Sequence, residues 1–97
     1  MHAERYWVYI LACNNGAYYT GYTTDLTRRY AEHLAGKCKY TRSFKPLSSP
    51  VSWQIHGSKA DAMKVERWIK KLKRPQKIEL ISNPDLLAKL FSLSKKD

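Results

Sequence analysis

The stretch that decides the fold runs from residue 6 to residue 23 and reads YWVYILACNNGAYYTGYT. Residues 6–12 and 17–23 are rich in β-branched and aromatic side chains, and the turn signal Asn14-Asn15-Gly16 separates them. Two such runs around a short Asn/Gly turn are typical of a β-hairpin. The sequence therefore predicts two antiparallel strands near the start of the chain.

The length of this turn decides which side chains share a face of the hairpin. A two-residue turn would pair Tyr9 with Tyr22 and put Tyr9 and Tyr19 on opposite faces. A three-residue loop with Gly16 in the left-handed conformation pairs Tyr9 with Gly21 and leaves Tyr19 on the same face as Tyr9. We expect the three-residue loop, because it gathers both tyrosines beside a glycine that leaves room for a backbone or a phosphate. Ordinary aromatic packing is the simpler interpretation of two strand tyrosines.

One helix and one further strand are predicted after the hairpin. Thr24 or Asp25 can cap a helix that extends to about residue 35, where Gly36 suits the position after the C-cap. Residues 50–56 alternate enough to form a third strand, with Pro50 at its first position, where a missing donor is tolerated.

The C-terminal part of the chain is predicted to be helical. Residues 58–61 resemble a capping box and open a helix that Pro75 should stop after Arg74. Residues 76–81 contain apolar side chains and are expected to be helical. Asn83 before a proline is typical of an N-cap, which predicts a last helix over about residues 84–93.

The composition indicates one small domain with an anionic partner. The chain has 97 residues, and its 18 Lys and Arg against 8 Asp and Glu give a formal net charge of +10. Nucleic acid is the leading partner for such a charge, and an anionic membrane is the lesser one. No segment approaches the roughly 20 apolar residues of a membrane span or has the layout of a signal peptide, so we expect a cytoplasmic protein. Cys13 and Cys38 have no zinc-site spacing and are expected to be unpaired bystanders.

Ionisable residues occupy helix positions that should be apolar. Arg29 and His33 fall on the apolar stripe of the helix predicted after Asp25, and Glu66 falls on that of the later helix. Burying an unpaired charge costs several kcal/mol, so these three side chains should meet partners, a metal or solvent in a cleft. In the simpler alternative Arg29 extends to solvent, His33 is a satisfied half-buried histidine, and Glu66 pairs with Lys70 at i+4.

Residues 37–46 (KCKYTRSFKP) have no periodicity, four cations and two aromatic residues, which predicts a basic loop. Its cations would hold a nucleic-acid backbone, and its aromatic rings would stack on unpaired bases. A solvated basic face is the simpler alternative. The residues assigned to nucleic-acid binding are Lys37, Lys39, Tyr40, Arg42 and Lys45, with Phe44 as a second stacking ring, and Lys70, Lys71, Lys73 and Arg74 extend the positive surface.

The order and spacing of these polar residues resemble the GIY-YIG endonuclease superfamily, in particular its small stand-alone bacterial members. The resemblance spans about residues 6–81, and within its two short motifs the tyrosines and Gly21 match the family's letters. The residues that carry the resemblance are Val8-Tyr9-Ile10, Tyr19-Thr20-Gly21, Asp25-Leu26-Thr27-Arg28-Arg29, His33 and Glu66.

The resemblance implies an α+β fold, in which helices flank a small three-stranded antiparallel sheet in the order β-β-α-β-α-α. It implies a single domain over residues 1–97, with a core at about 6–81. The implied activity is metal-dependent endonucleolytic cleavage of nucleic acid, DNA more than RNA, with repair or recombination as the setting. A monomer is the default expectation, and the oligomeric state is left open.

The resemblance also implies a role for each site residue. Tyr9 and Tyr19 would line the site, Arg29 would hold the phosphate, and Glu66 would bind one divalent metal, Mg²⁺ or Mn²⁺. His33 occupies a position where many members have a histidine. Asn83 lies at about the distance of an asparagine that contributes in some members, but we do not carry that role over because a helix cap already explains it.

Two questions about mechanism and class stay open at this point. Tyr9 would position or deprotonate the attacking water, which requires its pKa to fall from about 10, or His33 would take that proton or orient Tyr19. The alternative to a nuclease is a non-catalytic basic module that binds nucleic acid on the same fold. A protein interaction adaptor would leave the charge of +10 and Arg29 without an explanation.

Overall fold

The hairpin that opens the chain is present in the computed structural model, which describes residues 5–38, 46 and 50–94. The predicted α+β class and the order β-β-α-β-α-α are confirmed, with the final helical part of that order divided into α3 and α4. The elements are β1 (Tyr6–Ala12), β2 (Tyr18–Thr23), α1 (Leu26–Leu34), β3 (Val51–Ile55), α2 (Lys59–Lys70), α3 (Arg74–Ser82) and α4 (Leu86–Ser94).

The turn between β1 and β2 has the predicted three-residue form. The Cys13 N–H donates to the Ala17 carbonyl at 2.9 Å, and the Gly16 N–H donates to the Cys13 carbonyl at 2.9 Å. Gly16 has a φ of 84°, the left-handed conformation that closes such a loop. Tyr9 consequently pairs with Gly21, as expected.

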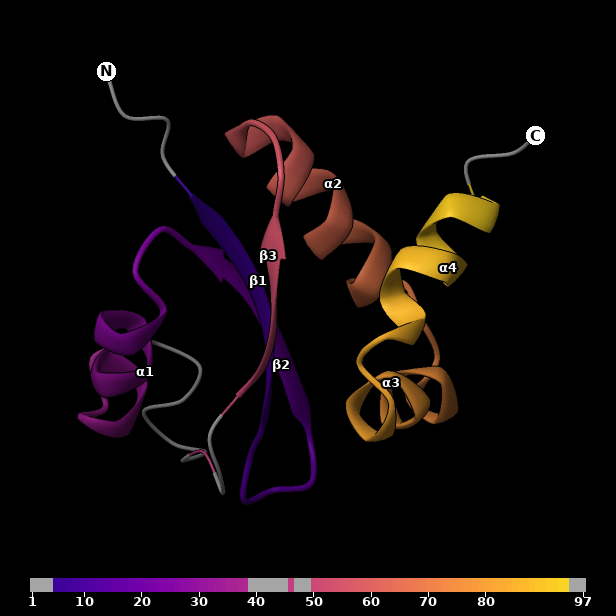
Figure 1. Cartoon of the computed structure of the whole chain (residues 1–97). Helices are drawn as coiled ribbons and strands as arrows, with labels where there is room; N and C mark the ends of the chain where they lie inside the picture. Colours follow the sequence, from indigo (N-terminus) through magenta and orange to yellow (C-terminus); the bar gives the residue numbers. More distant parts are fainter. Residues whose placement is uncertain (1–4, 39–45, 47–49, 95–97) are drawn as a thin grey trace.

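The sheet separates two unequal layers of helix. Its strand order is β2-β1-β3, so β1 is central and antiparallel to both neighbours. Figure 1 shows α1 on one face and α2, α3 and α4 on the other. Because side chains alternate along a strand, Val8 and Ile10 face the larger layer, while Tyr9 faces α1. The buried core of the larger layer consists of Val8, Ile10, Ala62, Val65, Ile69, Leu80 and Leu87.

Local capping fixes both ends of α1 where the sequence predicts them. The Asp25 side chain accepts a hydrogen bond from the Arg28 N–H at 3.0 Å, which makes Asp25 the N-cap. Ala35 is the C-cap, and Gly36 follows with a φ of 74°. The Thr23 hydroxyl accepts from the Asp25 N–H at 3.1 Å and so joins the end of β2 to the start of α1.

The predicted end of α2 at Arg74 is wrong. The capping box at Ser58 and Asp61 is confirmed, but α2 ends at Lys70, and Arg74 begins α3. Pro75 lies in the first turn of α3, where proline lacks only an N–H that would have no helical partner. Pro75 therefore begins a helix instead of stopping one, and the helical prediction for residues 76–81 is confirmed within α3.

The predicted start of α4 after an Asn83 N-cap is also wrong. Asn83 is the C-cap of α3, because its N–H donates to the Glu79 carbonyl at 2.9 Å. One turn then intervenes, and α4 begins at Leu86 and ends at Ser94. The Trp53 indole N–H donates to the Pro84 carbonyl at 2.7 Å and joins this turn to β3. Among the described helices, none has the length and apolar character needed to cross a bilayer.

Thr20 in β2 gives a test of the packing between the sheet and the larger layer. Its side chain is 3% exposed, and its hydroxyl is buried with no hydrogen-bond partner among the described residues. Thr20→Val keeps the shape and removes this unsatisfied group, so we expect the free energy of unfolding to rise by about 1 kcal/mol. Urea denaturation measures the change.

Thr23→Val is the matched control for Thr20→Val. Thr23 lies on the same strand and is 8% exposed, but its hydroxyl is bonded to the Asp25 backbone. We expect this variant to lose about 1 kcal/mol. Stability changes of the same sign in both variants would contradict the conclusion that the Thr20 hydroxyl is unsatisfied and the Thr23 hydroxyl is bonded.

Candidate active site

Tyr9, Tyr19 and His33 form an aromatic cluster between the hairpin and α1. The Tyr9 Oη and His33 Nε2 atoms are 2.9 Å apart and share a hydrogen bond. The Tyr19 ring centroid lies 5.1 Å from that of His33 and 6.3 Å from that of Tyr9. Tyr9 is 2% exposed and His33 is completely buried. Three of the five predicted catalytic residues therefore meet at one point.

Gly21 leaves the space that the Tyr9 and Tyr19 side chains occupy. A Cβ added at Gly21 would lie 2.6 Å from the Tyr9 Oη, 2.8 Å from the Tyr9 Cζ and 3.2 Å from the Tyr19 Cε1. Contacts below 3.0 Å require something to shift, so any larger residue would displace Tyr9. The pairing of Tyr9 with Gly21 is thus a steric requirement of the cluster.

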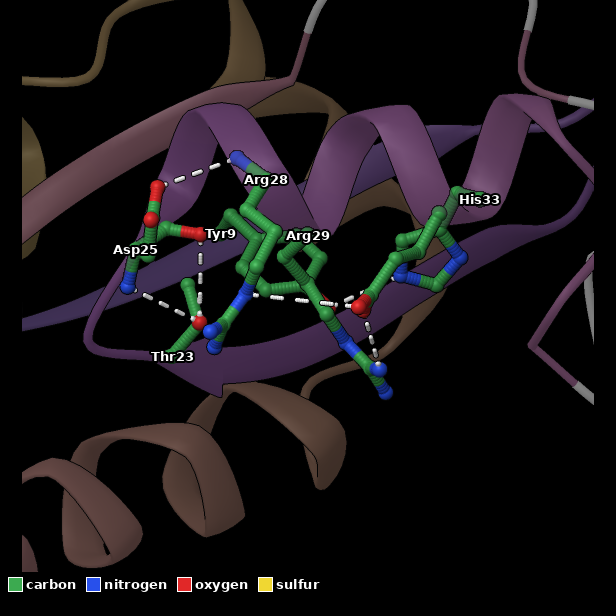
Figure 2. A network of polar contacts seen from close by, with 7 residues as sticks. Tyr9, Thr23, Asp25, Arg28, Arg29 and His33 are labelled. Carbon is green, nitrogen blue, oxygen red and sulfur yellow. Dashed lines mark hydrogen bonds and ion pairs between the residues drawn. The ribbon is translucent and has the colours of Figure 1, made fainter.

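Arg29 stands at the solvent side of the cluster, one turn before His33 on α1 (Figure 2). Its guanidinium donates to the Glu32 Oε1 at 3.1 Å, and its side chain is 36% exposed. Glu32 was not predicted as a site residue. Its signal in the sequence is its spacing, because it follows Arg29 by three positions and Arg28 by four on one helix. Arg29 combines a fixed position with access to solvent.

The pKa values of the cluster follow from its burial. Burial raises the pKa of Tyr9 to about 12, although hydrogen bonding to Arg29 opposes the rise. Burial, and then the charge of Arg29, lowers the pKa of His33, while Glu32 acts in the opposite direction. The fall in the pKa of Tyr9 that an ionised tyrosine base requires is therefore not found.

These pKa directions are compatible with a hydrogen bond donated by Tyr9 to His33. Tyr9 keeps its proton at neutral pH, and His33 is the neutral imidazole. The Tyr9 hydroxyl can then donate to the unprotonated Nε2 of His33 while its oxygen accepts from Arg29. The hydrogen bond with Tyr9 also raises the pKa of Arg29, which stays a cation.

Glu66, the remaining predicted site residue, lies in another layer. It is part of α2, on the face of the sheet opposite α1 (Figure 1). Its Oε2 lies 3.7 Å from the Lys70 Nζ, and its side chain is 16% exposed. The pairing with Lys70 named as the simpler alternative is therefore present, and Glu66 does not join the cluster.

The flank of α2 that carries Glu66 faces the β2 side of the sheet. Glu66 and Trp68 are two positions apart, so they point about 160° apart around the helix. Trp68 contacts Phe91 of α4, with the ring centroids at 5.5 Å. Glu66 therefore points away from α4, and α2 contacts both β1 and β2. The helix that carries Glu66 and the helix that carries His33 therefore lie on opposite faces of the sheet.

Few side chains in the described part of the chain are available to a metal. Within residues 5–38, 46 and 50–94, no group of three or more His, Cys, Asp or Glu side chains is placed to hold an ion. One carboxylate nevertheless fits Mg²⁺, which binds protein through one or two carboxylates and keeps several waters. Glu66 meets this requirement, with Lys70 as the cation that a metal would displace.

The structure describes only some of the residues predicted to bind nucleic acid. Lys37 is exposed just after α1. Lys39, Tyr40, Arg42 and Lys45 lie outside the described residues. A hollow of about 320 Å³ between β3 and α4 is lined mostly by apolar side chains such as Trp53 and Phe91, so it does not suit a phosphate.

Comparisons with known proteins show which family this chain resembles. A family model described as the GIY-YIG catalytic domain matches residues 5–79. A UPF0213 protein of Listeria welshimeri is 43% identical over 76 residues, 77% of this chain and 83% of that protein. One of Cupriavidus pinatubonensis is 49% identical over 81 residues, 80% of this chain and 88% of that protein. The solution NMR structure of a UPF0213 protein from Bacillus halodurans is 43% identical, with a TM-score of 0.47 over 80% of this chain and 83% of that chain.

Gly21→Ala tests the steric requirement of the cluster. The new Cβ would overlap the Tyr9 side chain, so we expect a loss of about 1–3 kcal/mol of unfolding free energy. In a Tyr9→Phe background the nearest clashing atom is absent, and the loss should be smaller. Urea denaturation of the four proteins of this double-mutant cycle measures the coupling. An equal loss in both backgrounds would refute a clash with the Tyr9 hydroxyl.

His33 should make the stability depend on pH. Its pKa is lowered in the folded protein, so the contribution is complete above the unfolded value of about 6.5 and is lost as the pH falls below it. In His33→Gln this loss should disappear, as measured by denaturation between neutral and mildly acidic pH. His56→Gln, at an exposed histidine, is the control and should retain the wild-type dependence. A wild-type pH dependence in His33→Gln would exclude His33 as its source.

Proposed function

Because the chain belongs to the GIY-YIG family, within the UPF0213 group of small bacterial and archaeal proteins, we propose that it is a metal-dependent endonuclease. Its substrate is nucleic acid, DNA in preference to RNA, and its setting is repair or recombination in the cytoplasm. The observation that supports this most directly is the 2.9 Å contact between Tyr9 and His33, with Arg29 one helical turn away. A phenol, an imidazole and a guanidinium are thereby held at one place.

Arg29 holds the scissile phosphate in this proposal. Its guanidinium is charged, partly exposed and fixed by Glu32, so it can turn a planar pair of donors toward two phosphate oxygens. As negative charge develops on those oxygens during attack, a fixed cation stabilises the transition state more than the ground state. Glu32 serves as a positioning residue that keeps the guanidinium in place.

Tyr9 and His33 move the proton of the attacking water. The Tyr9 oxygen accepts a proton from the water as the Tyr9 hydroxyl passes its own proton to the His33 Nε2. His33 becomes imidazolium and Tyr9 ends neutral, so the raised pKa of Tyr9 is no obstacle. His33 is thus the proton acceptor and Tyr9 the relay. Tyr19, which is half-buried, contacts both rings and orients them.

Glu66 holds one Mg²⁺ or Mn²⁺ ion in this proposal. Such an ion, when bound, supplies positive charge against the phosphate oxygens and the leaving oxygen. Glu66, on the flank of α2 that faces the β2 side of the sheet, would hold this ion in place of its present partner Lys70. The residues assigned to nucleic-acid binding from the sequence, Lys37, Lys39, Tyr40, Arg42 and Lys45, bind the same strand in this proposal.

One observation favours a second candidate function, a module that binds nucleic acid without cutting it. Glu66 is paired with Lys70 and lies in the layer opposite the aromatic cluster. A domain that had no use for a metal would keep such a pair as an ordinary helical ion pair. Both functions share the basic surface, so a cleavage assay separates them.

Cleavage by two variants tests the nuclease. We expect Glu66→Ala to abolish cutting and His33→Gln to slow it by about 10²- to 10⁴-fold, with binding retained in both. Single-stranded, duplex and flapped DNA and RNA are incubated with Mg²⁺, Mn²⁺ or EDTA, and strand breaks are read on a gel.

Glu79→Ala is the control for these variants, because Glu79 is an exposed glutamate on α3. It should cut like the wild type. Binding of every substrate without metal-dependent cutting by the wild type would instead support the non-catalytic module.

A further inference from the structure

The junction between α2 and α3 carries positive charge that the candidate active site does not use. Residues 67–77 read RWIKKLKRPQK and contain six Lys and Arg with no Asp or Glu. We call this segment the basic junction. Its exposed members are Arg67, Lys70, Lys71, Lys73 and Arg74.

Two cations of the basic junction already have structural partners. Lys70 pairs with Glu66, and the Arg74 Nη1 donates to the Gly16 carbonyl at 2.6 Å. The Arg74 guanidinium also lies 4.8 Å from the centroid of the Tyr18 ring. Arg74 therefore fastens the start of α3 to the end of the hairpin. Within the described part of the chain, Lys71 and Lys73 have no ion-pair partner and are directed to solvent.

The basic junction and the candidate active site meet at the edge strand β2. Tyr18 and Tyr19 are consecutive, so their side chains point to opposite faces of the sheet. Tyr18 carries Arg74 on one face, and Tyr19 packs against His33 on the other. Figure 1 shows α3 beside the hairpin, on the side of the sheet opposite α1. Two adjacent residues of β2 therefore contact the basic junction and the candidate active site, respectively.

We propose that the basic junction binds the phosphate backbone of the same nucleic-acid strand that enters the site, and that this strand passes around the edge of β2. The inference rests on the proposed function, because that function brings the strand to Arg29 and Tyr19. Lys71 and Lys73 act as point charges on phosphates away from the cleaved bond. Such contacts fix the position of the strand and read no bases.

The lysines of the junction are suited to this task by their chemistry. Each presents a compact charge on a flexible stem, which binds a phosphate without a fixed geometry. Neutralising phosphates releases counterions, so the affinity falls as salt rises, with a slope that reports the number of contacts. The slope therefore gives a count of junction contacts that does not depend on cleavage.

A charge-matched pair of double variants tests the junction. Lys71→Gln with Lys73→Gln removes two exposed cations of the junction that have no ion-pair partner among the described residues, whereas Lys59→Gln with Lys89→Gln removes two exposed lysines elsewhere. Both double variants lower the net charge equally. Arg74 is kept, because its loss would also release α3 from the hairpin. Binding of a labelled oligonucleotide, single-stranded and duplex, is measured against salt by fluorescence anisotropy in EDTA.

The junction variant should bind more weakly, with a salt slope shallower by about 0.7 per lysine on a single strand or about 0.9 on duplex. The control variant should keep a slope close to that of the wild type. Equal slopes in the two double variants would overturn the proposal, because only net charge would then matter. Failure of the wild type to bind any oligonucleotide would overturn it as well. Binding without cutting would count against the nuclease and leave the junction supported.

Cleavage then separates strand positioning from general affinity. Substrates are extended on one side of the cut at a time. The KM of the wild type should fall when the extension is on one side and stay unchanged when it is on the other. In the junction variant KM should no longer fall on extension, and kcat at saturating substrate should stay at the wild-type value. An unchanged dependence on length would show that the cleaved strand does not reach the junction.

Discussion

A three-residue turn closed by Gly16 sets the pairing of Tyr9 with Gly21, and both faces of the sheet follow from that pairing. Because the side-chain period of a strand is two, a slip by one residue would exchange the faces. Val8 and Ile10 would then leave the core, and Tyr9 would leave α1. The core and the site therefore depend on one register.

The register also explains why polar residues can be buried under α1. Tyr9 and His33 satisfy each other across the layer between β1 and α1, so burial leaves neither polar group alone. Arg29 and Glu32 form a second pair closer to solvent. The polar face of the sheet thus carries charge and hydrogen bonds, whereas the opposite face is packed with apolar side chains.

Local signals in the sequence predicted the elements whose ends are chemically determined. The hairpin turn, the Asp25 cap of α1 and the capping box of α2 each depend on residues close together in the chain. Pro75 misled the prediction because proline is compatible with two situations, the end of one helix and the first turn of the next. Asn83 was ambiguous in the same way, since asparagine suits both ends of a helix.

The candidate site was predictable in part for similar reasons. The spacing in the sequence predicted that Tyr9, Tyr19, Arg29 and His33 lie together. The hairpin register places the two tyrosines, and α1 carries the other two residues. Glu66 is carried by another layer, and its distance from them depends on tertiary packing that no local pattern encodes. The raised pKa of Tyr9 likewise depends on how deeply the ring is buried, which its residue type does not reveal.

The buried hydrogen bond between Tyr9 and His33 affects the stability of the fold. Apolar residues of similar volume, packed in the same space, often stabilise a domain more than a buried polar pair does. A chain selected only to hold its shape would have gained from such a replacement between β1 and α1. This chain instead keeps at the centre of its smaller layer a polar pair that an inert domain of the same architecture could discard.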